Sequence, residues 1–227
     1  MPSQTRTFRI PVPFSKTVEI ILHEPTLTDD NVGFKTWASA YLLSKRLPTL
    51  GLPAFLGSAK ALELGAGTGL VGLAVAAILK IPVLLTDLPQ IVPNLRRNVD
   101  ANASTLGGCV DVAVVDWRKG VGEVVDEELK YELVLAADPI YSPEHPALLV
   151  GMVKKWLKRM GQARVVVEIP LRDGFDGERE DFARRMEAAG LVVKMEGVEG
   201  GLDDWGTGEV QCRWSVWGWG HARVAMV

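Results

Sequence analysis

Hydrophobic residues in the central part of the chain follow two alternating patterns. From residue 59 onward, short runs that are apolar nearly throughout are separated by stretches of helical length. The expected strands are 59–65, 82–87, 110–116, 132–138 and 164–170, and the expected helices are 70–80, 89–103, 121–130, 146–160 and 176–189. Strands that are apolar on both faces and alternate with helices indicate a parallel sheet with helices packed on both sides.

The two ends of the chain follow a different pattern. Residues 1–35 contain two β-rich runs interrupted by Pro11 and Pro13, which favours a short edge hairpin over a central strand. A helix is expected at 36–47, where apolar residues recur at helical spacing and Pro48 ends it. At the C-terminus two β-rich runs flank a Gly/Asp-rich segment without a helix between them, so an antiparallel hairpin is predicted.

A chain of 227 residues suits one α/β domain. We expect a single domain over 1–227, with an N-terminal extension at 1–58 and a core at 59–227. The expected fold class is α/β, a doubly wound seven-stranded sheet that is mainly parallel and carries a C-terminal antiparallel hairpin. The start of the chain lacks a secretory signal and no run of roughly 18 apolar residues occurs, so we expect a cytoplasmic protein without a membrane span, with nuclear entry left open.

Composition narrows the range of partners. The hydrophobic fraction is 48%, the charged fraction 23% and the formal net charge −3, which argues against nucleic acid as the main partner. The 2 Cys and 3 His show no metal-ligand spacing, and we therefore expect no metal. Cys109 and Cys212 lie in apolar, strand-like runs, where buried, reduced thiols are expected.

A glycine-rich loop, Glu-Leu-Gly-Ala-Gly-Thr-Gly from Glu63 to Gly69, follows the first strand of the core. Ligands of open α/β sheets bind at the carboxyl ends of the strands, and glycines let the backbone approach them closely. S-adenosylmethionine (SAM), a nicotinamide dinucleotide and a purely structural turn are the three interpretations. The segment from Gly67 to Gly72 matches the dinucleotide string G-x-G-x-x-G. However, it starts late relative to the strand, and the carboxylate of Glu63 better suits the ammonium and sulfonium groups of SAM.

Acidic residues end three further strands of the predicted sheet. Asp87 is positioned to accept hydrogen bonds from ribose hydroxyls, which supports a nucleotide without choosing between the cofactors. Asp116 is positioned to accept from an adenine amino group, and Trp117 to stack on the ring; plain core packing of this indole is the alternative. Asp138 precedes Pro139, so we expect extended backbone that projects the carboxylate outward, beside the reacting methyl group. A tight turn without a catalytic role is the alternative for Asp138.

The motifs E-L-G-A-G-T-G, T-D-L, V-D-W and D-P-I-Y resemble those of the seven-β-strand methyltransferases, which have a Rossmann-like fold. Within these they resemble methyltransferase family 16, the protein-lysine methyltransferases. The resemblance extends from about residue 33 to the C-terminus and includes Trp37, in a helix before the first core strand. The segment D-P-I-Y-S-P-E-H-P and the Trp-rich final hairpin are most similar to fungal members that act on a translation elongation factor.

The resemblance implies a SAM-dependent protein-lysine N-methyltransferase that releases S-adenosylhomocysteine. It implies SAM contacts from Trp37, Gly65, Ala66, Gly67, Asp87, Trp117 and Ala137, with Glu63 holding the methionine portion through water. Asp138 and Tyr141 match the family element D-x-x-Y, which lines the acceptor channel. Many relatives carry an acid or arginine near Trp37, whereas this chain has Thr36 and Ser39 there, so the methionine carboxylate is expected to be bound differently.

The acceptor implied by the resemblance is a lysine on another protein, with an elongation factor as one candidate and a monomeric enzyme expected. At pH 7 only roughly one lysine in a few thousand is neutral. We expect Asp138 to guide the ammonium, and Tyr141 to form one wall of an apolar channel that lowers the amine pKa by desolvation. His145 is a weaker candidate for a general base. The alternatives are a small-molecule or RNA methyltransferase of the same fold, a silent SAM-binding module and a nicotinamide oxidoreductase.

The predicted C-terminal hairpin carries Trp205, Trp214, Trp217 and Trp219. Because side chains alternate along a strand, Trp217 and Trp219 are expected on one face and Trp214 on the other. Core and edge packing is the favoured role, and a docking surface for a protein substrate is the alternative.

Overall fold

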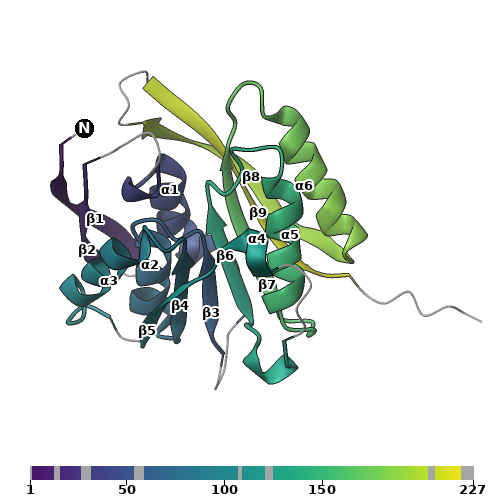
Figure 1. Cartoon of the computed structure of the whole chain (residues 1–227), viewed down its shortest axis with the longest axis horizontal. Helices are drawn as coiled ribbons and strands as arrows, with labels where there is room; N and C mark the ends of the chain where they lie inside the picture. The colour runs from purple at the N-terminus through teal and green to yellow at the C-terminus, as the bar shows by residue number, and fades with distance from the viewer. Residues whose placement is uncertain are drawn as a thin grey trace, which may run out of the picture.

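The computed structural model describes residues 2–12, 16–26, 32–53, 59–106, 109–120, 125–203 and 208–220. Its centre is a seven-stranded sheet with the order β5-β4-β3-β6-β7-β9-β8 (Figure 1). The strands are β3 (Ala61–Leu64), β4 (Val83–Asp87), β5 (Val110–Val114), β6 (Leu133–Ala137), β7 (Arg164–Pro170), β8 (Leu191–Asp203) and β9 (Gly208–Trp219). Neighbours from β5 to β7 pair in parallel, whereas β9 is antiparallel to both β7 and β8. The predicted α/β architecture is confirmed.

Helices connect the parallel strands, as the alternating pattern predicts. The connecting helices are α2 (Leu70–Leu79), α3 (Val92–Ala101), α4 (Trp117–Gly120) and α5 (His145–Trp156). Helix α1 (Ala38–Arg46) precedes β3, and α6 (Asp176–Ala188) leads from β7 to β8. The helix expected at 121–130 was wrong for its described part, which contains only a 3-10 turn at Glu127–Leu129. Residues 121–124 lie outside the described residues, and the short helix α4 comes earlier than expected.

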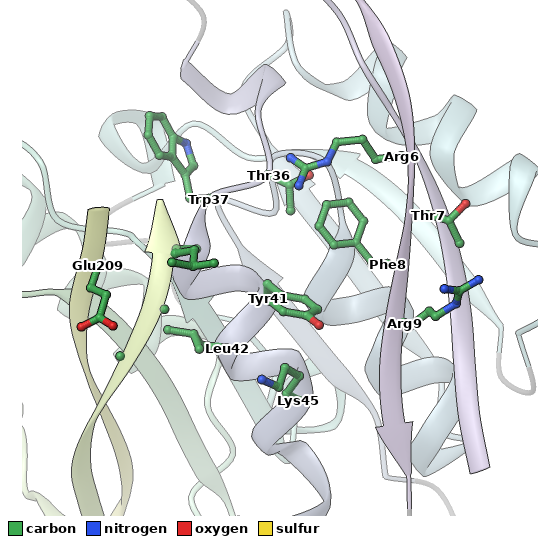
Figure 2. A pocket seen from close by; sticks show the side chains of 14 residues that line it. Arg6, Thr7, Phe8, Arg9, Thr36, Trp37, Tyr41, Leu42, Lys45 and Glu209 are labelled. Atoms are coloured by element: carbon green, nitrogen blue, oxygen red, sulfur yellow. The ribbon is translucent and has the colours of Figure 1, made fainter. Parts of the chain in front are cut away.

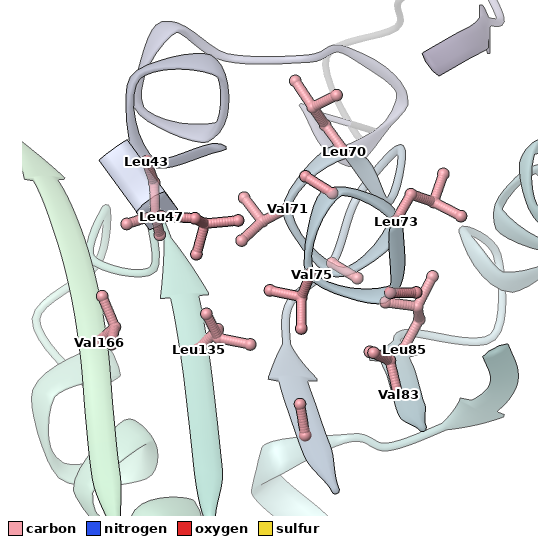
Figure 3. Packing of buried hydrophobic residues seen from close by; sticks show 14 of the residues in the cluster. Leu43, Leu47, Leu70, Val71, Leu73, Val75, Val83, Leu85, Leu135 and Val166 are labelled. Carbon is pink, nitrogen blue, oxygen red and sulfur yellow. The ribbon is translucent and has the colours of Figure 1, made fainter. Parts of the chain in front are cut away.

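The sheet separates two hydrophobic cores, which explains why its strands are apolar on both faces. Leu62 and Val134 face the core beneath α5 and α6, whereas Ala61 and Leu135 face the core beneath α1 and α2. Figure 3 shows the second of these cores, with Leu43 of α1, Leu47 just after this helix and valines of α2 pointing toward Leu135 and its neighbours on the sheet. Buried apolar side chains on both faces fix the middle of the sheet, and the loops at its carboxyl edge remain available for a site.

The N-terminal hairpin forms its own two-stranded sheet, β1 (Gln4–Val12) and β2 (Lys16–Glu24), instead of extending the central one. Side chains of α3 and of Asn102, the residue just after it, hold the outer edge of β2. Asn102 accepts from the N–H of Ile21 and donates to its carbonyl, and Asn98 does the same at His23. The backbone groups of this edge are therefore satisfied by amide side chains.

The C-terminal hairpin presents its tryptophans as predicted. Trp217 packs edge-on against Phe182 of α6, with ring centroids 5.9 Å apart, and Trp219 borders the same core. Trp214 belongs to the core on the α1 side. Trp205 lies outside the described residues.

The two cysteines differ in exposure. Cys212 is buried, as expected. The expectation for Cys109 was wrong, because it precedes β5 at the end of the sheet, where its side chain is exposed. Among the described helices, none is both long and apolar enough to cross a membrane.

Candidate active site

A cavity of about 420 Å³ opens at the carboxyl ends of β3, β4, β5 and β6. Every residue that the sequence analysis singled out as catalytic or cofactor-binding lines it. These are Trp37, Glu63, Gly65, Ala66, Gly67, Asp87, Asp116, Trp117, Ala137, Asp138 and Tyr141. The predicted strand tips therefore converge on one hollow, and His145 lines it as well.

The glycine loop after β3 has a backbone that favours glycine. Gly65, Gly67 and Gly69 have φ angles of +67°, +56° and +91°. A Cβ at Gly65 would lie 3.3 Å from Cζ2 of Trp117, and one at Gly69 would lie 2.6 Å from Cδ1 of Leu95. The loop can thus pass beneath the indole while α2 starts close against its neighbours.

Asp87, at the end of β4, holds this loop. One carboxylate oxygen accepts from the N–H of Gly67 at 2.7 Å, and the other accepts from the N–H of Leu88 at 2.7 Å. Burial raises the pKa of Asp87, although these two hydrogen bonds oppose the shift. Each carboxylate oxygen has a further lone pair, so Asp87 can still accept hydrogen bonds from two adjacent hydroxyl groups in the cavity.

Glu63, in β3, is a buried acid at the floor of the cavity, with a side chain that is only 2% exposed. One of its oxygens accepts from the N–H of Gly72 at 2.8 Å. Burial raises the pKa of Glu63 to about 8, and the negative charge of Asp87 adds to this effect. A cationic group bound nearby would favour the carboxylate form. Glu63 is therefore suited to an ammonium or sulfonium ligand, and poorly suited to a phosphate.

Trp117 and Asp116 form the wall beyond β5. The indole of Trp117 lies edge-on to the ring of His145, with centroids 6.0 Å apart, and covers Gly65. Asp116 accepts from the N–H of Arg118 at 3.1 Å and lies 3.5 Å from the ammonium of Lys119. The wall thus combines a flat aromatic surface with a carboxylate, which suits an adenine ring.

Asp138 differs from its prediction. Its φ is +53°, in the left-handed region instead of the extended region, and the residue is only 8% exposed. Its carboxylate accepts two hydrogen bonds from Arg172, at 2.8 and 2.6 Å. Aspartate tolerates this backbone region better than most residues. The hydrogen bond from its N–H to the carbonyl of Glu168, 2.8 Å long, and the paired guanidinium outweigh the preference imposed by Pro139.

Arg172 was missed in the sequence analysis. It follows β7, the strand that pairs with β6, and its guanidinium lies 5.5 Å from the ring centroid of Trp37. In the sequence, the available signal was that Arg172 lies two residues after the end of β7, the last of the parallel strands. The side chain connects Asp138, at the end of β6, with Trp37, at the start of α1.

Tyr141 and His145 form the remaining wall. Their rings meet edge-on with centroids 4.2 Å apart, and the N–H of Tyr141 points to Nδ1 of His145 at 3.4 Å. Half of the surface of Tyr141 is exposed, but partial burial raises its pKa, and the charges of Asp87 and Asp138 add to this. Burial also lowers the pKa of His145. Both side chains are therefore neutral at neutral pH, and this wall carries no charge that would hold an ammonium.

The arrangement of these elements is that of a methyltransferase fold. The chain is similar to a putative RNA methyltransferase, PH1948 from Pyrococcus horikoshii, with a TM-score of 0.56 and 14% identity over 79% of this chain and 82% of that one. It is also similar to M. jannaschii TYW2 in complex with AdoMet, with a TM-score of 0.53 and 16% identity over 94% of this chain and 88% of that one. At this level of identity the likeness concerns the fold alone.

Sequence comparison identifies the family. Residues 15–188 match the lysine methyltransferase family, and the chain belongs to it. It is 39% identical to the Saccharomyces cerevisiae protein-lysine N-methyltransferase EFM2 over 90% of this chain, but spans only 52% of EFM2. It is 38% identical to the Schizosaccharomyces pombe protein-lysine N-methyltransferase rrg1, over 95% of this chain and 71% of rrg1. The mouse EEF1A lysine methyltransferase 3 is 35% identical over 56% of this chain and 54% of its own length.

Proposed function

We propose that the protein transfers a methyl group from SAM to a lysine side chain of another protein. The observation that carries this proposal is the convergence of strand tips on one cavity, with Glu63 and Asp87 on one side and Asp138 on the other. Membership of the lysine methyltransferase family supports both the cofactor and the acceptor.

The residues around the glycine loop fit SAM. Asp87 would accept the two ribose hydroxyls, while Trp117 and Asp116 would hold the adenine by its face and its amino group. Glu63 would face the methionine ammonium, directly or through water, because a buried acid with a raised pKa is stabilised by a cation. The rest of the SAM pocket would be formed by Trp37, Gly65, Ala66, Gly67 and Ala137. Bound SAM supplies a methyl group already activated by a positively charged sulfur.

The acceptor side must deliver a neutral amine, since an ammonium has no lone pair. At pH 7 this costs about 4–5 kcal/mol for an unperturbed lysine. The carboxylate of Asp138, whose charge Arg172 already balances, would receive the arriving ammonium of the lysine. The neutral rings of Tyr141 and His145 would then displace water and lower the amine pKa, so that the proton leaves to solvent.

The acceptor protein that we propose is a translation elongation factor. The name of the mouse relative, EEF1A lysine methyltransferase 3, supports this class. We further propose that the enzyme is a monomer and works in the cytoplasm, where such factors are abundant. Because the chain spans only part of EFM2, the activity proposed here is that of the described catalytic unit.

Radiolabelled SAM tests the proposal directly. The protein is incubated with purified fungal elongation factors 1A and 2 and, separately, with a lysate of cells that lack the enzyme. We expect label on a protein band, and mass spectrometry should find methyl groups on lysine. Asp87→Ala serves as the inactive control. Label confined to RNA or to small molecules would contradict the lysine assignment, and label on another protein would contradict only the elongation factor.

A further inference from the structure

A second hollow, a groove of about 630 Å³, lies beside the active-site cavity. Figure 2 shows α1 on its floor, with β1 on one side and β8 on the other, while β2 and β9 lie beyond them. Thr36 and Trp37 line both the groove and the cavity. A chain lying in the groove would therefore lead directly to the site at Trp37.

The edge of β1 that faces this groove has backbone groups available for pairing. In an antiparallel pair of strands, the backbone N–H and C=O groups of two opposite residues either hydrogen-bond to each other or both point away, toward the outer edges of the two strands. Ile21 and His23 of β2 bond outward, to Asn102 and Asn98. Their partners Thr7 and Thr5 must then point their N–H and C=O groups to the opposite edge, and by alternation Arg9 does so as well. Thr7 and Arg9 line the groove.

Strand β8, on the opposite side of the groove, also has backbone groups that point outward from its edge. β8 is the last strand of the central sheet and pairs with β9 alone among the described strands. The carbonyl of Gln211 in β9 accepts from the N–H of Leu171 at 2.7 Å, so Gln211 points away from β8. Its partner Gly200 therefore points its backbone groups outward, as does Leu202 two residues on. Within the described residues, two strand edges with open backbone groups thus border a single groove, which is unusual, since exposed edges invite pairing.

The charge on the groove is mainly positive. Among the described residues that line it, Arg6, Arg9 and Lys45 are cationic and Glu209 is acidic. Arg6 lies 3.6 Å from the carboxylate of Glu24, which does not line the groove. The charged groups of Arg9 and Lys45 lie at the surface. The guanidinium of Arg9 pairs with the exposed Glu19, and the ammonium of Lys45 lies 5.2 Å from the ring centroid of Tyr41. Tyr41 and Leu42 supply an apolar floor between them. An acidic chain with apolar side chains at alternate positions complements this surface.

We propose that the groove binds an extended, acidic segment of the acceptor protein, which pairs with β1 as an added strand and carries the target lysine past Trp37. Main-chain hydrogen bonds to Thr7 and Arg9 would supply affinity, and the cations and the apolar floor would supply specificity. The inference rests on the proposed function, because it places the acceptor that this function requires.

Proline substitution separates edge pairing from folding. Thr7→Pro removes an outward N–H without breaking the β1–β2 ladder, and Pro11 already occupies an equivalent outward position in the same strand. Thr5→Pro is the matched control, since Thr5 has the same orientation and exposure but lies outside the groove. We expect Thr7→Pro to raise the KM for the acceptor about tenfold, with kcat and SAM affinity unchanged. Thr5→Pro should resemble the wild type.

The variants are compared by their rates of methyl transfer from radioactive SAM in a lysate, on whichever acceptor the wild-type enzyme labels. If that acceptor is not an elongation factor, the proposed acceptor fails while the groove is still tested. Equal labelling by Thr7→Pro and Thr5→Pro would overturn the inference. If Thr7→Pro loses its fold, amide-resolved hydrogen exchange of the wild-type protein with the purified acceptor decides instead. The N–H groups of Thr7 and Arg9 should become protected, and unchanged exchange there would overturn the inference. A wild-type enzyme that labels no protein would overturn both proposals.

Discussion

Arg172 holds the carboxylate of Asp138 with two parallel hydrogen bonds, 2.8 and 2.6 Å long, at the end of β6 that borders the cavity. Such a bidentate pair is among the stronger interactions of charged side chains. Its effect on chemistry is larger than its effect on packing, because an unpaired carboxylate would stabilise the ammonium form of a nearby lysine. With Arg172 in place, Asp138 can orient an amine without keeping it protonated.

Removal of the guanidinium tests this neutralisation. In Arg172→Met, the charge of Asp138 is no longer balanced, so the pKa of the bound amine rises. We expect turnover at pH 7.5 to fall about tenfold, and the rising limb of the pH–rate profile to move up by about one pH unit. Arg172→Lys retains a cation and should restore the wild-type limb. A profile that does not move in Arg172→Met would show that the pair is only structural.

Asp138 itself is best tested with asparagine. Asparagine keeps the size of the side chain and tolerates the φ of +53°, so the backbone is not strained. We expect Asp138→Asn to lower kcat about a hundredfold and to change SAM affinity less than about threefold. Asp173→Asn, at a neighbouring exposed position, is the control. Unchanged turnover in Asp138→Asn would remove this carboxylate from the mechanism.

Asp87 is expected to control cofactor binding. Its two oxygens fix Gly67 and Leu88, and alanine would remove both of these anchors together with the acceptor for ribose hydroxyls. Asp87→Ala should therefore bind SAM at least about a hundredfold more weakly, since hydrogen bonds to a charged group contribute roughly 1.5–3 kcal/mol each. Isothermal titration calorimetry measures this, with Asp100→Ala on the exposed side of α3 as control. SAM affinity of the wild-type strength would disprove the ribose assignment.

Most of the fold could be predicted because its strands are buried on both faces. Runs such as Leu133–Ala137 are apolar at every position, and that pattern determines both strand type and parallel pairing. The separate sheet of β1 and β2 was less predictable. Its position depends on amide contacts from Asn98 in α3 and Asn102 just after it, which lie more than 70 residues away in sequence.

The cavity was predictable from one topological rule, that ligands bind at the carboxyl ends of parallel strands. This rule places Glu63, Asp87 and Asp138 together without knowledge of any side-chain contact. It does not give their orientations. The backbone of Asp138 is set by Glu168 and Arg172 on the neighbouring strand and its loop, so a preference derived from Pro139 alone was insufficient.

Gly72 tests the close packing beneath the glycine loop. A Cβ there would lie 2.1 Å from Cδ2 of Leu85 and 2.7 Å from a carboxylate oxygen of Glu63. We expect Gly72→Ala to lower the free energy of unfolding by about 2–3 kcal/mol through overpacking. Gly177→Ala is the matched control, because this glycine is also helical but meets no atom within 4 Å. Its stability should stay within about 1 kcal/mol of the wild type, or rise. Urea unfolding of both variants measures the difference, and equal stability would disprove the packing argument.

Glu168 gives the stability of the protein a specific pH dependence. It is fully buried in β7, and in the described part of the chain neither side-chain oxygen has a hydrogen-bond partner. Burial raises the pKa of Glu168 to about 9 from its ordinary value near 4.5, and the charge of Glu199 adds to this. A folded-state pKa above the unfolded one means that the unfolded chain releases this proton first. The contribution of Glu168 to the free energy of unfolding is therefore complete below about pH 4.5 and decreases as the pH rises to about 9.

Glutamine cannot ionise, so Glu168→Gln should not show this decrease. The free energy of unfolding of the variant, relative to the wild type, should rise by on the order of 2 to 4 kcal/mol between pH 5 and pH 8, because the wild type loses up to about 1.4 kcal/mol for each pH unit between the two pKa values. Urea unfolding at both pH values measures this difference. Glu187→Gln, at an exposed position of α6, is the control and should keep a constant difference from the wild type. If Glu168→Gln also keeps a constant difference, Glu168 has its ordinary pKa in the folded protein, and burial does not raise it.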